Sequence, residues 1–207
     1  MLEVDSVTKY YHVNNKRIEA LKEVSFKIEG TEIFGIMGRS GSGKTTLLKI
    51  IAGLIPPSTG TVRLNGGIVT KPTRKIGMVF QDYVAFPWLT VGKNIEFGLK
   101  INKIFGQSRN LIVDKMLDAT GLAEHRKMYP ITLSGGQKQR LAIARALAIE
   151  PEVLLMDEPF GALDEDTKSQ MYILLKSIWD RIHFKLIFVT HNRKEAEKIC
   201  NRIITLK

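Results

Sequence analysis

One run of eight residues has the spacing G-x-x-x-x-G-K-[ST], which is typical of loops that bind phosphate groups. The run consists of Gly38, Arg39, Ser40, Gly41, Ser42, Gly43, Lys44 and Thr45, and Thr46 follows it. It lies between the apolar segment 33–37 and a segment typical of a helix, 44–54. A loop in this position can surround an anion with backbone N–H groups and the positive end of the helix. Lys44 would then place its charge on the β and γ phosphates of a nucleotide, and the Thr45 hydroxyl would bind Mg²⁺. The dinucleotide spacing G-x-G-x-x-G is excluded, because Lys44, Thr45 and Thr46 follow Gly43.

Three further polar residues come directly after apolar segments that indicate strands of a parallel sheet. Asp157 and Glu158 follow the segment 153–156, and His191 follows the segment 186–190. The carboxyl ends of parallel strands meet at one edge of a sheet, where ligands bind. Asp157 can therefore reach a Mg²⁺ ion at the phosphates, while Glu158 stays free to act on a water molecule. His191 is expected at the same edge.

A second glycine-rich turn precedes a predicted helix that ends near Ile149. Its residues are Leu133, Ser134, Gly135, Gly136 and Gln137. Ser134 is expected to cap the helix, and two glycines at a helix start can form a second nest for an anion. On its own this pattern would indicate an ordinary helix-start loop. Beside the first loop, we interpret it as a second contact for the γ phosphate.

The order of the predicted elements indicates an α/β fold. Alternating residues in segments 2–7 and 18–28 indicate antiparallel strands near the N-terminus. Apolar runs at 33–37, 76–80, 153–156, 186–190 and 203–206, with helical patterns between the last three, indicate a mostly parallel core sheet. From about residue 82 to 150, helical patterns separated by turn residues predict a helical subdomain. We expect the whole chain, 1–207, to form one domain.

Composition excludes several classes of protein. The 207 residues are 44% hydrophobic and 25% charged, as in folded globular domains. No apolar run approaches the roughly 18 residues of a membrane span, and the acidic start does not resemble a secretory signal. The single cysteine, Cys200, cannot form an internal disulfide. The net charge of +10 fits either an anionic partner or an ordinary basic surface.

With these residues together, the chain resembles the ATP-binding cassette (ABC) ATPases over essentially its whole length. The resemblance assigns the phosphate loop from Gly38 to Thr46 as Walker A, Gln81 as the Q-loop and Leu133 to Gln137 as the LSGGQ signature. It also assigns Asp157 as the Walker B acid, Glu158 as the catalytic carboxylate, the segment from Gly161 to Asp164 as the D-loop and His191 as the switch histidine. Tyr11 is expected to stack on adenine, with Tyr10 as the alternative.

The resemblance implies a mechanism and partners. Two cassettes would pair head to tail, so that each ATP lies between the Walker A loop of one chain and the signature of the other. Ser134 and Gly136 would thereby contact the nucleotide of the partner, and Gly135, Gln137 and Asp164 are also expected to bind nucleotide. Thr45, Gln81 and Asp157 would hold Mg²⁺, Glu158 would polarise the attacking water, His191 and Gln81 would sense the γ phosphate, and Lys44 would stabilise its charge. The permease would be a separate membrane protein, served indirectly by a solute-binding protein, and this chain would lie at the cytoplasmic face of the membrane.

The segment after Gln81 indicates a branch of the family. Residues 87–91 read Pro-Trp-Leu-Thr-Val and residues 94–99 read Asn-Ile-Glu-Phe-Gly-Leu. This pattern is similar to ATPases of nitrate, sulfonate and taurine importers. The opening segment 7–11 is also similar to efflux and lipoprotein-release cassettes. A soluble ABC ATPase acting on nucleic acid is disfavoured, because the chain has one cassette and no sustained heptads. No nucleic acid partner is expected, nor an appended regulatory domain after the last apolar segment.

An apolar cluster follows the Q-loop, on what should be a loop. Its residues are Phe86, Pro87 and Trp88. Either the cluster packs against the cassette's own helices, or it contributes to a groove for a short cytoplasmic helix of the permease.

Overall fold

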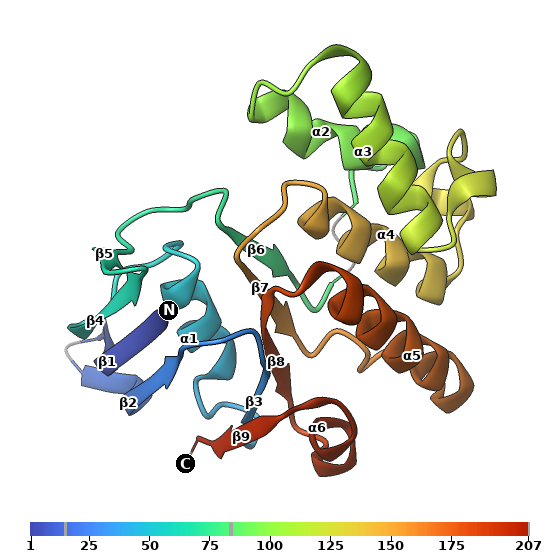
Figure 1. The fold of residues 1–207 in the computed structure, drawn as a ribbon. Helices are drawn as coiled ribbons and strands as arrows, with labels where there is room; N and C mark the ends of the chain where they lie inside the picture. Colours follow the sequence, from blue (N-terminus) through green and yellow to red (C-terminus); the bar gives the residue numbers. More distant parts are fainter. Residues whose placement is uncertain (15, 83–84, 207) are drawn as a thin grey trace.

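The computed structural model describes residues 1–14, 16–82 and 85–206. These residues form two β-sheets, with helices on both sides of the larger sheet (Figure 1). Tyr83 and Val84, which lie within the sequence pattern after Gln81, fall outside the described residues. In the described part of the chain, no helix combines the length and apolar character that crossing a membrane requires.

The smaller sheet is antiparallel and lies at the N-terminal end of the chain (Figure 1). Its strands are β1 (Leu2–Val13), β2 (Lys16–Ile28), β4 (Thr59–Leu64) and β5 (Gly67–Ile68), in the order β2-β1-β4-β5. The two predicted antiparallel strands are confirmed as the hairpin β1–β2. Strands β4 and β5 were not predicted, because β4 contains only Val62 and Leu64 as apolar residues and β5 is two residues long.

The larger sheet is entirely parallel. Its strands are β3 (Ile33–Met37), β6 (Ile76–Val79), β7 (Val153–Asp157), β8 (Lys185–Thr190) and β9 (Arg202–Thr205), in the order β6-β7-β8-β3-β9. The helices α1 (Lys44–Ile51), α5 (Glu165–Ile182) and α6 (Arg193–Ile199) connect these strands or follow them. The predicted mostly parallel core sheet is confirmed, with each strand within two residues of its expected bounds.

Each face of the parallel sheet has its own apolar core. Along β7, Val153 and Leu155 pack with α1 and the antiparallel strands. Leu154 and Met156 point to the opposite side and pack with α4 (Gly135–Leu147) and α5. Because every residue of β7 is buried, this strand appears in the sequence as a continuous apolar run rather than as an alternating one.

The helical part contains α2 (Val91–Ile101), α3 (Gly106–Ala119) and α4, with two short 3₁₀ turns, η1 (Ala123–His125) and η2 (Pro130–Thr132). Figure 1 shows α2 and α3 standing away from the sheets, while α4 lies beside α5. Helix α4 contacts α2, α3, β6 and α5, and therefore joins the helical part to the parallel sheet. The predicted α/β fold with a helical subdomain is confirmed, whereas its limits at 82 and 150 stay a prediction.

Candidate nucleotide-binding site

The strand order brings three of the predicted motifs to one edge of the parallel sheet. Strand β8 lies between β7 and β3, and the register pairs Met37 with Thr190 and Asp157 with Val189. The three strands therefore end at the same level. The phosphate loop after β3, the acids at the end of β7 and the histidine after β8 are neighbours for this reason.

The phosphate loop has a backbone shape that requires glycine. Gly41 and Gly43 have φ angles of 81° and 89°, in the left-handed region. A Cβ atom at Gly43 would lie 2.4 Å from the backbone oxygen of Ala20, and one at Gly38 would lie 2.3 Å from the Oγ atom of Ser42. Gly43 is also the N-cap of α1 and offers no side chain to cap it. The loop therefore wraps tightly and presents the start of a helix, as an anion-binding loop must.

Lys44 lies inside this loop and is almost fully buried, with 6% of its surface exposed. Its Nζ atom donates hydrogen bonds to the backbone oxygens of Gly38 and Arg39, both at 3.0 Å. The same atom lies 3.4 Å from Oε1 of Glu158. A buried ammonium group is costly unless it is paired, so these three oxygens hold the Lys44 charge at the centre of the loop.

The carboxylate of Asp157 has the chemistry of a metal ligand. The side chain is 3% exposed, and its Oδ1 atom has no hydrogen-bond partner among the described residues. Burial raises the pKa of Asp157; a hydrogen bond with Thr45 and the charge of Lys44 lower it, and the charge of Glu158 raises it. A buried, unpaired carboxylate oxygen beside a threonine hydroxyl matches the oxygen ligands that Mg²⁺ prefers. Mg²⁺ commonly takes one or two protein ligands and completes its shell with phosphates and water, so these residues fit the ion.

Glu158 connects Lys44 to the predicted switch histidine. One carboxylate oxygen, Oε1, faces Lys44, and the other, Oε2, lies 2.9 Å from Nδ1 of His191. Glu158 has a φ angle of 44°, an uncommon backbone conformation for a residue other than glycine. Its backbone N–H donates to the oxygen of Val189 at 3.0 Å, which fixes this turn against β8. A hollow of about 600 Å³ opens beside the pair, lined by Met37, Gly38, Arg39, Ser40, Glu158, His191 and Thr205.

The second glycine-rich turn is built as a helix cap. The Ser134 hydroxyl accepts a hydrogen bond from the backbone N–H of Gln137, and Oε1 of Gln137 accepts one from the N–H of Ser134. This reciprocal capping box confirms Ser134 as the N-cap of α4. Gly135 and Gly136 face the start of α5, where a Cβ at Gly136 would lie 2.8 Å from Cγ2 of Thr167.

Comparison with known proteins decides the family. The family described as ABC transporter matches residues 21–161. This chain belongs to the ABC transporter ATP-binding cassettes. The nitrate import ATP-binding protein NrtD of Synechocystis sp. is 44% identical over 205 residues, which are 99% of this chain and 77% of NrtD. The aliphatic sulfonates import ATP-binding protein SsuB of Bacillus cereus is 40% identical, over 99% of this chain and 80% of SsuB.

Two further comparisons concern longer relatives and the fold. The sulfate/thiosulfate import ATP-binding protein CysA of Mycobacterium tuberculosis is 47% identical over 90% of this chain, but the match spans only 54% of CysA. A dimeric ATP-binding cassette in a post-hydrolysis state, bound to ADP and Pi, aligns with a TM-score of 0.87 and 36% identity, over 100% of this chain and 94% of that one. The chain described here is therefore an ATP-binding ATPase, and the α/β cassette fold predicted from its sequence is confirmed.

The remaining predicted site residues lie outside the Lys44–Glu158–His191 group. Gln81 is exposed directly beyond β6. Asp164 caps α5, because its carboxylate accepts hydrogen bonds from the N–H of Thr167 at 2.9 Å and from its hydroxyl at 2.7 Å. The hydrogen bond from the Thr167 N–H lowers the pKa of Asp164 most, and the hydrogen bond from the Thr167 hydroxyl lowers it further. The predicted contacts of Gln81 with metal and of Asp164 with nucleotide stay predictions.

The two candidate adenine-stacking residues differ in what covers their rings. Tyr11 is 43% exposed, with Nζ of Lys9 at 5.3 Å from the ring centroid. Tyr10 is half-buried, and the guanidinium of Arg17 lies 3.5 Å from its ring centroid. Tyr11 therefore has the more open ring face, which agrees with the preference for Tyr11, while Tyr10 remains the alternative.

Two groups that support these motifs were not predicted from the sequence. His125 contacts the signature helix, with its Nε2 atom 2.8 Å from Nε2 of Gln137. Glu195 is buried beside Thr190, the residue before His191, and accepts a hydrogen bond from the Thr190 hydroxyl. The spacing from Asn192 to Glu195 is that of a capping box, and this pattern could have identified Glu195.

Proposed function

We propose that this cassette hydrolyses ATP to power the import of a small solute such as nitrate, a sulfonate or taurine. The proposal is supported by the similarity to NrtD and SsuB, import ATP-binding proteins for nitrate and for aliphatic sulfonates, each aligned over 99% of this chain. The sequence pattern after Gln81 points to the same branch. Efflux or lipoprotein release is the alternative, and the permease that co-purifies with the chain distinguishes the two.

The observation that carries the mechanism is the position of Glu158 between Lys44 and His191. With its oxygens 3.4 Å from Nζ of Lys44 and 2.9 Å from Nδ1 of His191, the carboxylate is held in a fixed orientation beside the phosphate loop. Glu158 would orient a water for in-line attack on the γ phosphate and take its proton. Lys44 would stabilise the charge that spreads over the phosphoryl oxygens, and His191 would keep Glu158 in place.

Thr45, Asp157 and Gln81 would hold Mg²⁺. When bound, the ion supplies positive charge to the β and γ phosphates. The buried Oδ1 atom of Asp157 supports this assignment, and the exposed position of Gln81 leaves it free to approach from outside the loop. The lysine, the threonine and the two acids would therefore face the same phosphate groups.

Two substitutions test the assignment. Glu158→Gln should keep ATP affinity, lose about 10²- to 10⁴-fold in turnover, and accumulate an ATP-bound dimer visible by size-exclusion chromatography. Lys44→Ala should lose ATP binding, measured by equilibrium titration. Lys22→Ala and Glu23→Gln, both exposed on β2, serve as matched controls. Normal hydrolysis by Lys44→Ala would remove the site, and normal turnover by Glu158→Gln would move the base to another residue, with His191 next.

We further propose that a second cassette completes each site. Ser134, Gly135, Gly136 and Gln137 lie at the start of α4, which packs on the opposite face of the parallel sheet from α1, the helix that follows the phosphate loop. The ATPase rate should then rise more steeply than linearly with protein concentration until the dimer is saturated. A linear rise in a chain that stays monomeric with ATP would contradict the composite site.

The segment after Gln81 offers a surface for the permease. Phe86 packs within the chain, with its ring centroid 4.4 Å from that of Phe97 and the guanidinium of Arg145 at 4.5 Å. Trp88 instead is 70% exposed. Residues of β6, α2 and α4 line a hollow of about 300 Å³ beside Phe86. We propose that a short cytoplasmic helix of the permease docks here, which would place the cassette at the cytoplasmic face of the membrane.

A further inference from the structure

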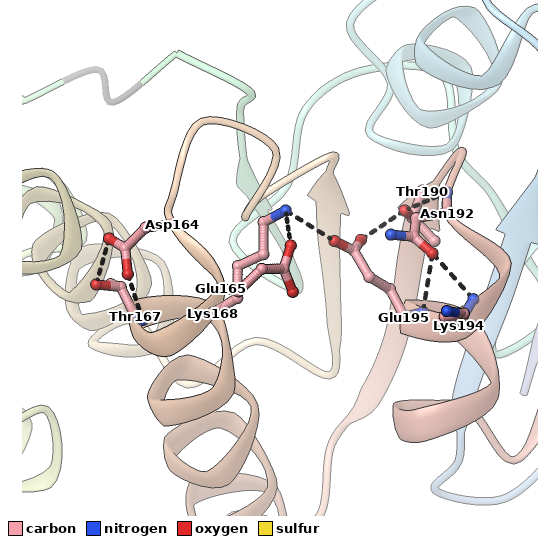
Figure 2. Close-up of polar contacts among 8 residues, drawn as sticks. All are labelled: Asp164, Glu165, Thr167, Lys168, Thr190, Asn192, Lys194 and Glu195. Carbon is pink, nitrogen blue, oxygen red and sulfur yellow. Dashed lines mark hydrogen bonds and ion pairs between the residues drawn. The ribbon is translucent and has the colours of Figure 1, made fainter.

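The turn that carries His191 is closed by the hydroxyl of the preceding residue. Thr190, the last residue of β8, is 2% exposed. Its Oγ1 accepts a hydrogen bond from the backbone N–H of Asn192 at 3.0 Å and donates one to Oε2 of Glu195 at 2.7 Å. Figure 2 shows this hydroxyl between the two partners. Both neighbours of His191 in the chain are therefore bound to each other, while the imidazole itself remains exposed.

Glu195 occupies the place of the acid in a capping box but does not complete one. Asn192 caps α6 by accepting from the N–H groups of Lys194 and Glu195. In a capping box the acid reaches back to the N–H of the cap residue. Here the Thr190 hydroxyl accepts the hydrogen bond from that N–H and donates its own hydrogen bond to Glu195. The last residue of β8 is thereby built into the first turn of α6.

The other side of Glu195 faces α5. Its Oε1 atom lies 3.7 Å from Nζ of Lys168, which is also 3.1 Å from Oε1 of Glu165 (Figure 2). Burial raises the pKa of Tyr172 on the same helix, and the charge and hydrogen bonding of Glu195 raise it further. A carboxylate with 8% of its surface exposed needs such partners, because an unpaired charge there would be strongly unfavourable.

Helix α5 connects this carboxylate to the D-loop. Asp164 caps the start of this helix, its carboxylate accepts hydrogen bonds from Thr167, and Lys168 is the residue after Thr167 (Figure 2). Thr167 is also the residue that a Cβ at Gly136 of the signature would meet. The first turn of α5 thus contacts the signature on one side and reaches the His191 turn through Lys168 and Glu195 on the other.

We propose that Glu195 is a positioning residue for His191, holding the turn through the Thr190 hydroxyl and tying it to the first turn of α5 through Lys168. The proposal rests on the role of His191 given above. Glu195 would act on His191 only through these partners and not on the nucleotide itself. Its effect is to fix the backbone on both sides of His191, so that Nδ1 stays within reach of Glu158.

Four substitutions, two of them controls, separate this role from simple stabilisation. Thr190→Val keeps the shape of the side chain and removes the hydroxyl, whereas Thr190→Ser keeps the hydroxyl. Glu195→Gln keeps the size and removes the charge. Glu197→Gln, on the exposed side of α6, is the matched control. We expect Thr190→Val and Glu195→Gln to lower kcat about 10-fold with KM for ATP changed less than about 2-fold, and Thr190→Ser and Glu197→Gln to retain kcat.

A double-mutant cycle with His191→Ala tests whether the effect passes through the histidine. In the His191→Ala background, Thr190→Val should lower kcat by less than about 2-fold further, because the residue that it positions is gone. An undiminished loss in that background would overturn the proposal.

NMR of the histidine ring protons reads the position of His191 without activity. The His191 signals should move in Thr190→Val and Glu195→Gln, less in Lys168→Met, and not in Glu197→Gln. Thermal unfolding identifies any variant that fails to fold. If Thr190→Val and Glu195→Gln both fail to fold, the shift of the His191 signals in Lys168→Met tests the proposal instead. If His191→Ala retains kcat, the catalytic role of His191 falls, and the NMR result still decides the positioning: unchanged His191 signals in folded Thr190→Val and Glu195→Gln would overturn it.

Discussion

A methyl group added at Gly136 should destabilise the cassette, whereas one added at Gly135 should not. The Cβ of an alanine at 136 would lie 2.8 Å from Cγ2 of Thr167, closer than carbon atoms tolerate. Thr167 cannot rotate away cheaply, because its hydroxyl is bound to Asp164 at 2.7 Å. At Gly135 the nearest atom, Cδ2 of Leu163, is 3.4 Å away and belongs to a flexible side chain.

The size of the effect follows from two opposing contributions. Overpacking costs about 1–3 kcal/mol, and replacing glycine by alanine in a helix recovers up to about 1 kcal/mol, less at a helix start. Gly136→Ala should therefore lose about 1–2 kcal/mol of the free energy of unfolding. For a domain of this size, each 1 kcal/mol shifts Tm by about 2–4 °C, so a fall of roughly 2–8 °C is expected. Gly135→Ala should match or slightly exceed the wild-type Tm.

Thermal unfolding followed by circular dichroism, without nucleotide, measures both variants on the same scale. The second change Thr167→Ser removes Cγ2 and keeps the hydroxyl that Asp164 binds. In Gly136→Ala it should restore most of the lost stability, while Thr167→Ser alone should have a small effect. Equal Tm values for the two glycine variants, or no recovery with Thr167→Ser, would refute the contact as the cause.

Three other changes have definite expected outcomes. Trp88→Ala removes a side chain that is 70% exposed, so Tm and basal ATPase activity should stay near wild type while the variant captures less permease in a pull-down. A large fall in Tm would show that Trp88 contributes to the core instead. Tyr11→Ala should weaken ATP binding, measured by titration, by about 1–3 kcal/mol, because adenine would stack on the Tyr11 ring, and Tyr10→Ala should have less effect. A larger loss in Tyr10→Ala would assign the stacking to Tyr10. Burial raises the pKa of the Cys200 thiol to about 12, so at pH 8 the thiol should react with a disulfide reagent far more slowly in the folded chain than in denaturant. The rate in the folded chain should keep rising with pH beyond 9, because the thiolate is the reactive form. Equal rates in the folded chain and in denaturant would show that the thiol is not shielded.

Local sequence was sufficient for the elements whose pattern does not depend on distant partners. The apolar strand ending in Asp157 and Glu158, and the glycine loop before Lys44, are both defined by a few adjacent residues. Strand β4 was not predictable, because its Thr-Gly-Thr start becomes a strand only by pairing with β1. Tertiary pairing overrides weak local propensity there.

The supporting groups of the site depend on contacts between distant segments. His125 lies twelve residues before Gln137, and Lys168 contacts Glu195 from another helix. No pattern within one segment indicates such pairs. The residues of the phosphate loop, by contrast, are adjacent in the chain, and the short Lys44–Glu158 distance could be expected from the strand order alone.

Strand β3 has consequences for how the chain folds. It is formed early in the sequence, at Ile33–Met37, yet both of its neighbours in the sheet, β8 and β9, come from the last quarter of the chain. The first residue of the strand, Ile33, also contacts Asn201, whose side chain accepts a hydrogen bond from the N–H of Ile33 at 2.8 Å. During synthesis, both edges of β3 therefore stay unpaired until β8 and β9 have been made. Pairings this far apart in sequence slow folding and leave an apolar edge open to aggregation, so the phosphate loop is among the last parts of the cassette to gain its support.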